Sequence, residues 1–405
     1  MSWEKTTLGS VADIFSGYAF KSSDMNTECG TPLLKIKNIS SSRVSTECDT
    51  FLNVDFDLSK YSRFLLREDD FLVAMTGQGS VGRIGKMINC KSGYYVNQRV
   101  AIVRVDAKKA NPKFIFSQTA TQENENELFK KANGAGQPNI SAKQIGEIEL
   151  VLPDIDTQNR LANILSAYDD LIENNQKQIK LLEEAAQRLY KEWFVDLRFP
   201  GYENTPVIDG VPQRWRVLEI GDAFKTLLGG TPSREKSEYW KNGTIPWINS
   251  GKVNELRVVQ PSEYINDIAL NKSATKLLPK HTTLVAITGA TLGQVSYTEI
   301  ETCTNQSVVG IIDETQTYSE YVYCYVLDNI KRIIGKATGG AQQHINKDIV
   351  NKFPIVIPEE SISSAFQNIA KPYFEKINAL LVENIKLAEA RDRLLPKLMS
   401  GEIEV

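Results

Sequence analysis

Parts of the first half of the chain return in the second half at a nearly constant spacing. The run Leu72–Gly77 (LVAMTG) recurs as Leu284–Gly289 (LVAITG), 212 residues later. The pair Asn97-Gln98 recurs as Asn305-Gln306, 208 residues later. A period near 200 residues is far longer than the roughly 20 to 50 residues of a solenoid repeat. The repeat therefore predicts two copies of one globular fold, a covalent pseudo-dimer.

Each globular copy runs into a long helical pattern. We expect a first body at residues 1–152, a first helix at 153–198, a second body at 199–357 and a second helix at 358–405. Short apolar runs separated by Gly, Asn and Ser predict strands in the bodies. The predicted fold class is α+β: two mixed bodies separated by two long coiled-coil helices, with pseudo-two-fold symmetry that makes the helices antiparallel.

The helical segments have apolar residues spaced alternately four and three apart, which is the seam of a coiled coil. A first helix from about Gln158 to Val195, capped by Asp156 or Thr157, would be roughly 57 Å long. The second seam is expected to include Phe366 and Ile369. The residues predicted to pair the helices are Leu165, Ile172, Ile179, Leu182, Leu189, Ile377, Leu380, Leu387 and Leu394.

Composition excludes several classes of function. The chain has five cysteines at no metal-ligand or redox spacing and only two histidines, so no metal site is predicted. Two histidines and scattered serines give no triad, and no catalytic residue is predicted. The N-terminal segment has no apolar run of signal-peptide length, and no stretch approaches 18 apolar residues. A cytoplasmic protein is expected.

The net charge of −3 conceals an uneven distribution. No Asp or Glu occurs from Phe71 to Val105 or in the matching segment from Ile268 to Thr298, and both segments contain basic residues. Such windows are typical of a surface that faces a polyanion, and equally of buried strands, which exclude acids. Candidate DNA-binding residues are Lys35, Lys37, Gln78, Ser80, Arg83, Lys86, Lys91, Asn97, Gln98, Arg99, Lys252, Lys276, Lys280, Gln294, Asn305 and Gln306.

The repeated Asn-Gln pair has two interpretations. Asn and Gln can form paired hydrogen bonds with the N6 and N7 edge of adenine. Alternatively, their amides stabilise the adjacent Gly turn, which would explain why both copies have them. Specificity would then lie where the copies differ, such as Lys35 to Arg43 against Asn249 to Arg257.

The segment Gly77–Gly82 matches the G-x-G-x-x-G pattern of nucleotide and S-adenosylmethionine sites. Such a turn must lead into a helix whose N-terminus faces the ligand. The residues that follow, Arg83 to Lys91, have no helical periodicity, so we predict a strand, a tight turn and a returning strand. A stand-alone S-adenosylmethionine-dependent DNA methyltransferase is the alternative function. A scaffold unrelated to DNA, in which the helices only link two binding bodies, is another.

Together these features resemble the specificity (S) subunit of type I restriction-modification systems, over essentially the whole chain. The matching elements are the Trp3 and Trp215 starts, the two Thr-Gly turns, the two Asn-Gln pairs, the Gln-containing Gly-rich runs before Ile140 and Ile345, the boundaries at Pro153 and Pro358, and the ending Pro396–Gly401.

The resemblance implies that each body is a target-recognition domain for one half of an asymmetric, bipartite double-stranded DNA site. It implies that the helices space the two halves and dock two methyltransferase (M) subunits, which restriction (R) subunits then join. S-adenosylmethionine is expected in the M subunits, ATP and Mg in the R subunit, and no cofactor in this chain. The family's S subunit is non-catalytic.

Overall fold

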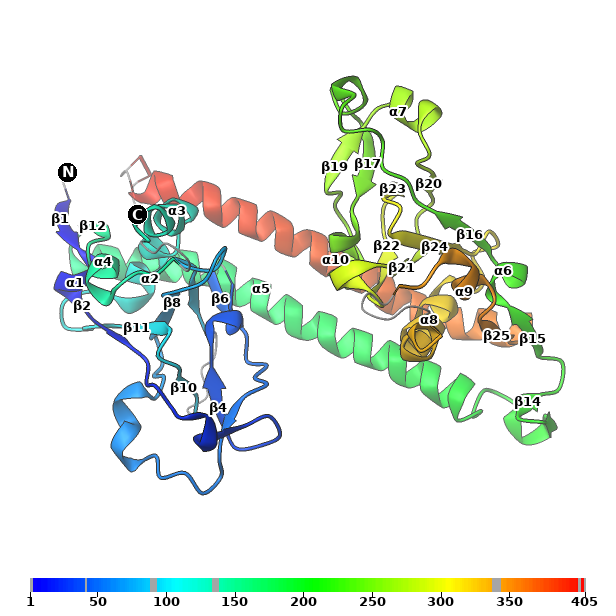
Figure 1. Cartoon of the computed structure of the whole chain (residues 1–405), viewed down its shortest axis with the longest axis horizontal. Coiled ribbons are helices and arrows are strands. Elements are labelled where there is room, and N and C mark those ends of the chain that lie inside the picture. The colour runs from blue at the N-terminus through cyan, green and yellow to red at the C-terminus, as the bar shows by residue number, and fades with distance from the viewer. Residues whose placement is uncertain are drawn as a thin grey trace. The chain divides into compact units, whose positions relative to one another are not determined.

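The computed structural model describes residues 3–40, 42–87, 93–132, 138–336, 344–399 and 402–403 (Figure 1). The chain divides into two compact units. Unit 1 comprises residues 1–173 and 386–405, and unit 2 comprises residues 174–385. Each unit contains one body together with a segment of each long helix, so the helices belong to both units.

Two sheets and a short strand pair build the first body. The larger sheet has the order β2 (Ala12–Ser16), β11 (Val100–Val105), β8 (Phe71–Ala74), β9 (Ile84–Lys86), β6 (Ser42–Val44), β5 (Ile39–Ser40). The smaller sheet has the order β10 (Tyr95–Val96), β4 (Thr31–Leu34), β7 (Phe51–Leu52), β3 (Met25–Asn26). The strand β1 (Glu4–Thr7) pairs with β12 (Glu149–Leu152). The helices are α1 (Leu8–Val11), α2 (Pro112–Thr119), α3 (Gln122–Lys131) and α4 (Ala142–Gly146).

The second body repeats this topology. Its larger sheet has the order β16 (Lys225–Leu228), β24 (Val308–Ile312), β21 (Thr283–Ala286), β22 (Val295–Thr298), β18 (Arg257–Val258). Its smaller sheet has the order β19 (Glu263–Ile265), β17 (Ile245–Ile248), β23 (Thr302–Thr304), β20 (Leu277–Leu278). The strand β15 (Arg216–Glu219) pairs with β25 (Pro354–Ile357), and a hairpin of β13 (Val207–Ile208) and β14 (Val211–Pro212) precedes them. The helices are α6 (Ile220–Ala223), α7 (Asp267–Lys272), α8 (Ser319–Ile334) and α9 (Lys347–Asn351).

The repeat extends to strand pairing. β8 lies antiparallel between β9 and β11, just as β21 lies between β22 and β24. Parallel pairs also recur, β4 with β10 and β17 with β23. The central strands β8 and β21 are buried along their whole length, because both faces of each strand are covered. This burial accounts for much of the absence of acids from the two sequence windows.

Two local expectations need correction. The helical spacing of the sequence from Pro112 to Lys131 predicts a helix there, but the structure has two, α2 and α3. The Thr121 side chain accepts a hydrogen bond from Asn124 N and caps the second helix. The first long helix is capped by Asp154, whose carboxylate accepts hydrogen bonds from the backbone and hydroxyl of Thr157. These bonds lower the pKa of Asp154. The helix therefore begins at Ile155, three residues before the expected start at Gln158.

The long helices are α5 (Ile155–Tyr190), which continues into a π-helical turn at Lys191–Val195, and α10 (Glu360–Met399). Within unit 2 they run antiparallel. Ile179 packs with Ile377 and Leu380, and Asn175 donates hydrogen bonds to Glu383 (3.1 Å) and Asn384 (3.0 Å). A polar pair on an apolar seam opposes slippage, because a shift would leave the amide unpaired.

Unit 1 has the same antiparallel sense. Leu161 and Leu165 of α5 share a core cluster with Leu398, and Arg391 of α10 forms an ion pair with Asp169 at 2.5 Å. The remaining predicted pairing residues are Ile172, which is 5% exposed, and the partly buried Leu182, Leu189, Leu387 and Leu394.

One predicted position of the second seam is wrong by one residue. Ile369 is 40% exposed, and the neighbouring Ala370 is buried beside Phe366 and Phe374. Leu165 of the first seam corresponds to Ala370 at the repeat offset of 205 residues, so the repeat indicates the correct position. The larger apolar side chain of Ile369 favours the wrong one. Among the described residues, no helix is long and apolar enough to cross a membrane.

Candidate nucleic-acid interface

Four loops of the first body meet where the strands β2, β4, β8 and β10 end. Asn97 N donates to Leu34 O (3.0 Å), Tyr18 N donates to Val96 O (2.9 Å), and Met75 N donates to Arg99 O (3.0 Å). We call this region the first polar edge: Gly17–Tyr18, Leu34–Lys35, Thr76–Arg83 and Asn97–Arg99.

The second body repeats these connections. Asn305 N donates to Ile248 O (3.0 Å), Gly230 N donates to Thr304 O (2.8 Å), and Ile287 N donates to Ser307 O (2.9 Å). The second polar edge is accordingly Gly229–Thr231, Ile248–Asn249, Thr288–Gln294 and Asn305–Ser307. The backbone framework of the two edges is shared, whereas their exposed side chains differ.

The two Asn side chains hold their own turns. Asn97 Oδ1 accepts from Arg99 N (3.3 Å), and Asn305 Oδ1 accepts from Ser307 N (3.1 Å). Both are Asx turns, in which the side chain caps the backbone two residues on. This geometry favours the scaffold interpretation for the asparagines, although the turn they stabilise is their own and not the adjacent Gly turn.

The two Gln side chains behave differently. Gln98 and Gln306 are both exposed. Gln306 Oε1 accepts a hydrogen bond from the Thr231 hydroxyl at 2.5 Å, which orients the amide. Ala19 takes the place of Thr231 in the first body, and Gln98 makes no side-chain hydrogen bond within the described residues. Gln98 therefore has both its donor and its acceptor available for a ligand.

The Gly77 turn is a strand connection, as its sequence predicts. It joins β8 directly to β9, and Gly77, Gly79 and Gly82 all have positive φ, between 77° and 108°. The strand β9, and not a helix, follows Gly82, so the turn lacks the helix N-terminus of a nucleotide site. Gln78 is exposed at its tip, and the Ser80 hydroxyl donates to Thr76 O (3.1 Å).

The candidate cations do not all lie on the polar edges. Lys35, Arg83 and Arg99 belong to the first edge, and Lys276 flanks the second because β20 pairs with β23 just before Asn305. Gln294 is exposed on the second edge itself. Lys91 lies outside the described residues.

Four of the candidate lysines lie outside the two polar edges: Lys37, Lys86, Lys252 and Lys280. Lys86 pairs in register with Phe71, at the end of β9 away from the first edge, and Lys280 precedes the corresponding end of β21. Their position was missed because the acid-free windows span strands whose two ends lie on opposite sides of the body. Three of these lysines already have carboxylate partners: Lys37 with Asp49, Lys86 with Asp69 and Lys252 with Glu255.

Two arginines expected among the specificity-determining residues instead face the long helices. Arg257 is 1% exposed, and its guanidinium donates to Glu183 of α5 at 2.8 Å. It lies over the rings of Tyr323 (4.4 Å) and Phe374 (4.3 Å). Arg43 occupies the corresponding strand β6, where burial lowers its pKa and the carboxylate of Asp169 on α5 opposes that shift.

Buried acids surround Arg257. Burial raises the pKa of Glu299 to about 7, and burial also raises the pKa of Glu320. Burial lowers the pKa of His281, which lies 3.8 Å from Glu299, and the charges of Lys371 and Lys280 act in the same direction. Within the described residues, no group of three His, Cys, Asp or Glu side chains is placed to hold a metal ion. This cluster attaches the second body to the helices, and it lies at the end of β22 away from the second polar edge, where Arg257 and Thr283 both pair with Tyr297.

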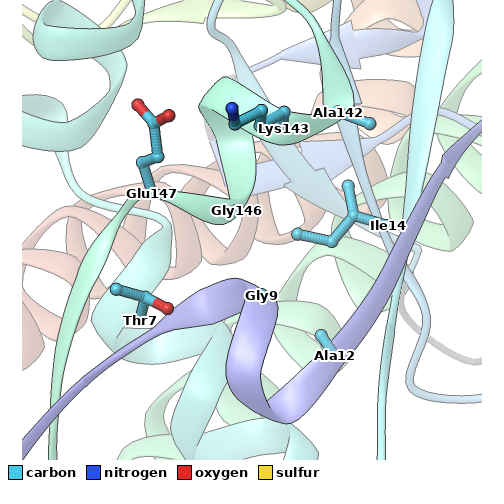
Figure 2. A pocket seen from close by; sticks show the side chains of 8 residues that line it. All are labelled: Thr7, Gly9, Ala12, Ile14, Ala142, Lys143, Gly146 and Glu147. Atoms are coloured by element: carbon cyan, nitrogen blue, oxygen red, sulfur yellow. The ribbon is translucent and has the colours of Figure 1, made fainter.

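A shallow hollow of about 390 Å³ lies on the first body, away from the polar edge (Figure 2). It is lined by Thr7, Gly9, Ala12, Ile14, Ala142, Lys143, Gly146 and Glu147. Gly9 and Gly146 approach closely there, since a Cβ on Gly9 would lie 3.3 Å from Gly146 O. In the second body Asn351 replaces Gly146, and its amide oxygen accepts a hydrogen bond from Thr226. A side chain thus occupies, in the second body, the position that Gly146 leaves open in the first.

Known proteins match this architecture. The family model of the type I restriction modification DNA specificity domain matches residues 1–184 and 212–383. The HindI specificity subunit of Haemophilus influenzae is 25% identical over 413 residues, covering 86% of this chain and 89% of that protein. The MjaIX specificity subunit of Methanocaldococcus jannaschii is 29% identical over 284 residues, covering 68% of this chain and 65% of that protein.

The fold is also known from a solved structure. The type I restriction-modification S subunit from M. genitalium aligns over 98% of this chain and 96% of its own, with a TM-score of 0.58 and 15% identity. Doubled mixed α/β bodies with long antiparallel helices define the class of DNA specificity proteins. The chain belongs to the type I restriction-modification specificity family, as the resemblance of its sequence motifs indicates.

Proposed function

We propose that this chain is the non-catalytic recognition subunit of a type I restriction-modification complex, and that it reads an asymmetric bipartite DNA site. Each polar edge would face one half-site. The observation that supports this most is that the two edges share a backbone framework but carry different side chains. The first edge has the exposed Gln98 and Arg99, and the second has the exposed Gln306 and the half-buried Ser307.

The base-reading residues are proposed from exposure and position. Gln98 and Gln78 offer amides to base edges, and Arg99 offers a guanidinium to guanine or phosphate. Lys276, Gln294 and Gln306 are their counterparts on the second edge. Lys86 and Lys280 lie at the other ends of their strands, and we propose for them at most a long-range electrostatic contribution to DNA binding.

The long helices are proposed to set the half-site spacing and to dock two M subunits, which R subunits join. The 36 residues of α5 correspond to about 54 Å of helix. S-adenosylmethionine would be bound by the M subunits, and ATP and Mg by the R subunit. Leu171 and Leu181 of α5 have exposed apolar side chains, 50% and 64% respectively, which a docked M subunit would cover.

The test is a methylome of cells that express this chain with its M subunit. One bipartite motif should be methylated, and replacing residues 1–152 with those of a relative should change one half of that motif and leave the other intact. Changes in both halves, or in neither, would contradict one body per half-site. Calorimetry of the isolated chain with S-adenosylmethionine separates this proposal from the methyltransferase alternative. Only the methyltransferase alternative requires the isolated chain to bind S-adenosylmethionine.

A further inference from the structure

The two polar edges share a backbone hydrogen bond but carry different side chains where it forms. Tyr18 N donates to Val96 O, and Gly230 N donates to Thr304 O. These pairs are equivalent in the repeat, since Val96 and Thr304 each precede the Asn-Gln turn. The first edge therefore presents a tyrosine where the second presents a glycine.

The ring of Tyr18 is held in place while remaining accessible. Its centroid lies 4.7 Å from that of Tyr61, 5.0 Å from Phe20 and 5.2 Å from Phe64. Tyr18 is nevertheless 36% exposed. A ring already fixed by three others loses little conformational entropy when a ligand contacts it.

The second body has no room for such a side chain. A Cβ on Gly230 would lie 2.7 Å from the carbonyl carbon of Ala274 and 2.8 Å from Thr275 N. In the first body the corresponding backbone, just before Leu65, lies in the 3-10 helix Ser59–Phe64, which supplies Tyr61 and Phe64. The same place is filled by backbone in one copy and by an aromatic ring in the other.

The chemistry of the first edge indicates what Tyr18 meets. Its neighbours Gln98 and Arg99 are polar and exposed, so the ring is an apolar surface in a polar setting. In the major groove the base edges present hydrogen-bonding groups and a single kind of apolar group, the thymine C5-methyl. Resting on the proposed function, we propose that Tyr18 contacts a thymine methyl in the half-site read by the first body. Gly230 leaves the second half-site without this contact.

The experiment measures DNA binding by the assembled M and S complex with fluorescence anisotropy. The duplexes carry the sequence motif that the methylome identifies. Scrambling either half-site should weaken binding by wild type, and if it does not, the proposed function itself fails. Replacing thymines of the first half-site by deoxyuridine removes only methyl groups and should weaken binding about fourfold, the effect of one buried methyl.

Tyr18→Ala should bind the thymine and deoxyuridine duplexes equally, and Tyr18→Phe should keep the wild-type preference. Tyr202→Ala, at a 43% exposed tyrosine outside both edges, is the matched control and should also keep it. An undiminished preference in Tyr18→Ala would overturn the proposal. So would equal binding of the two duplexes by wild type, a result that needs no variant to fold.

Discussion

Removal of Glu183 should destabilise unit 2 strongly, because it leaves the Arg257 guanidinium buried without its counter-ion. The Arg257 side chain is 0% exposed, and its Nε already has no hydrogen-bond partner among the described residues. Glu183 also accepts a hydrogen bond from the Tyr323 hydroxyl at 2.9 Å. Breaking a buried pair by deleting one partner costs about 3 to 5 kcal/mol. For a unit of this size, 3 kcal/mol corresponds to a fall of roughly 6 to 12 °C in melting temperature.

The assay is thermal unfolding of Glu183→Ala followed by circular dichroism, with Lys180→Ala as control. Lys180 and Glu184 form an exposed pair on the same helix at 4.0 Å, worth at most about 1 kcal/mol. The double variant Glu183→Leu/Arg257→Met should be more stable than Glu183→Ala, because it removes both charges together. A Glu183→Ala melting temperature equal to that of the control would refute the reasoning.

Three further outcomes are expected. Ile172→Asp should lower stability by several kcal/mol, since it places a charge at a position 5% exposed, whereas Leu171→Asp at the exposed neighbour should change it by less than about 0.5 kcal/mol; equal melting temperatures would count against the predicted seam. Glu299 has a folded pKa of about 7 against an ordinary 4.5, so its ionisation lowers the stability of the fold as pH rises from about 4.5 to 7, by about 3 kcal/mol above that range. Glu299→Gln should therefore be more stable than wild type at pH 8 and not at pH 4, which denaturant unfolding at the two pH values measures. The lowered pKa of His281 contributes with the opposite sign. DNA affinity of the M and S complex should fall at least tenfold between 50 and 200 mM salt, and an affinity independent of salt would contradict phosphate contacts.

Features that depend on local pattern could be predicted from the sequence. The repeat gives two equivalent bodies, and the strands around Phe71 and Val100 form as their apolar runs indicate. The four-three spacing gives α5 and most of its buried residues. Errors at this level are small: a helix start displaced by the Asp154 cap, a helix divided at Thr121, and Ile369 chosen in place of Ala370.

Features that depend on which end of a strand a residue occupies could not be predicted. Lys86 and Arg83 are three residues apart on one short stretch, yet only Arg83 adjoins the polar edge. The sequence alone does not indicate a role for Tyr18, because an aromatic residue is more often part of a core. Its exposure is decided by a ring cluster assembled from distant segments.

The sequence by itself determined that this protein is a doubled α+β chain with two long helices, because periodicity and repetition are properties of residue order. Only the tertiary structure decided which charged residues face outward. Arg257 and Lys276 are both cations of the second body, but one is enclosed by Tyr323, Phe374 and Glu183 while the other is exposed. Burial of a charge depends on partners contributed by other elements, and those partners become neighbours only when the chain folds.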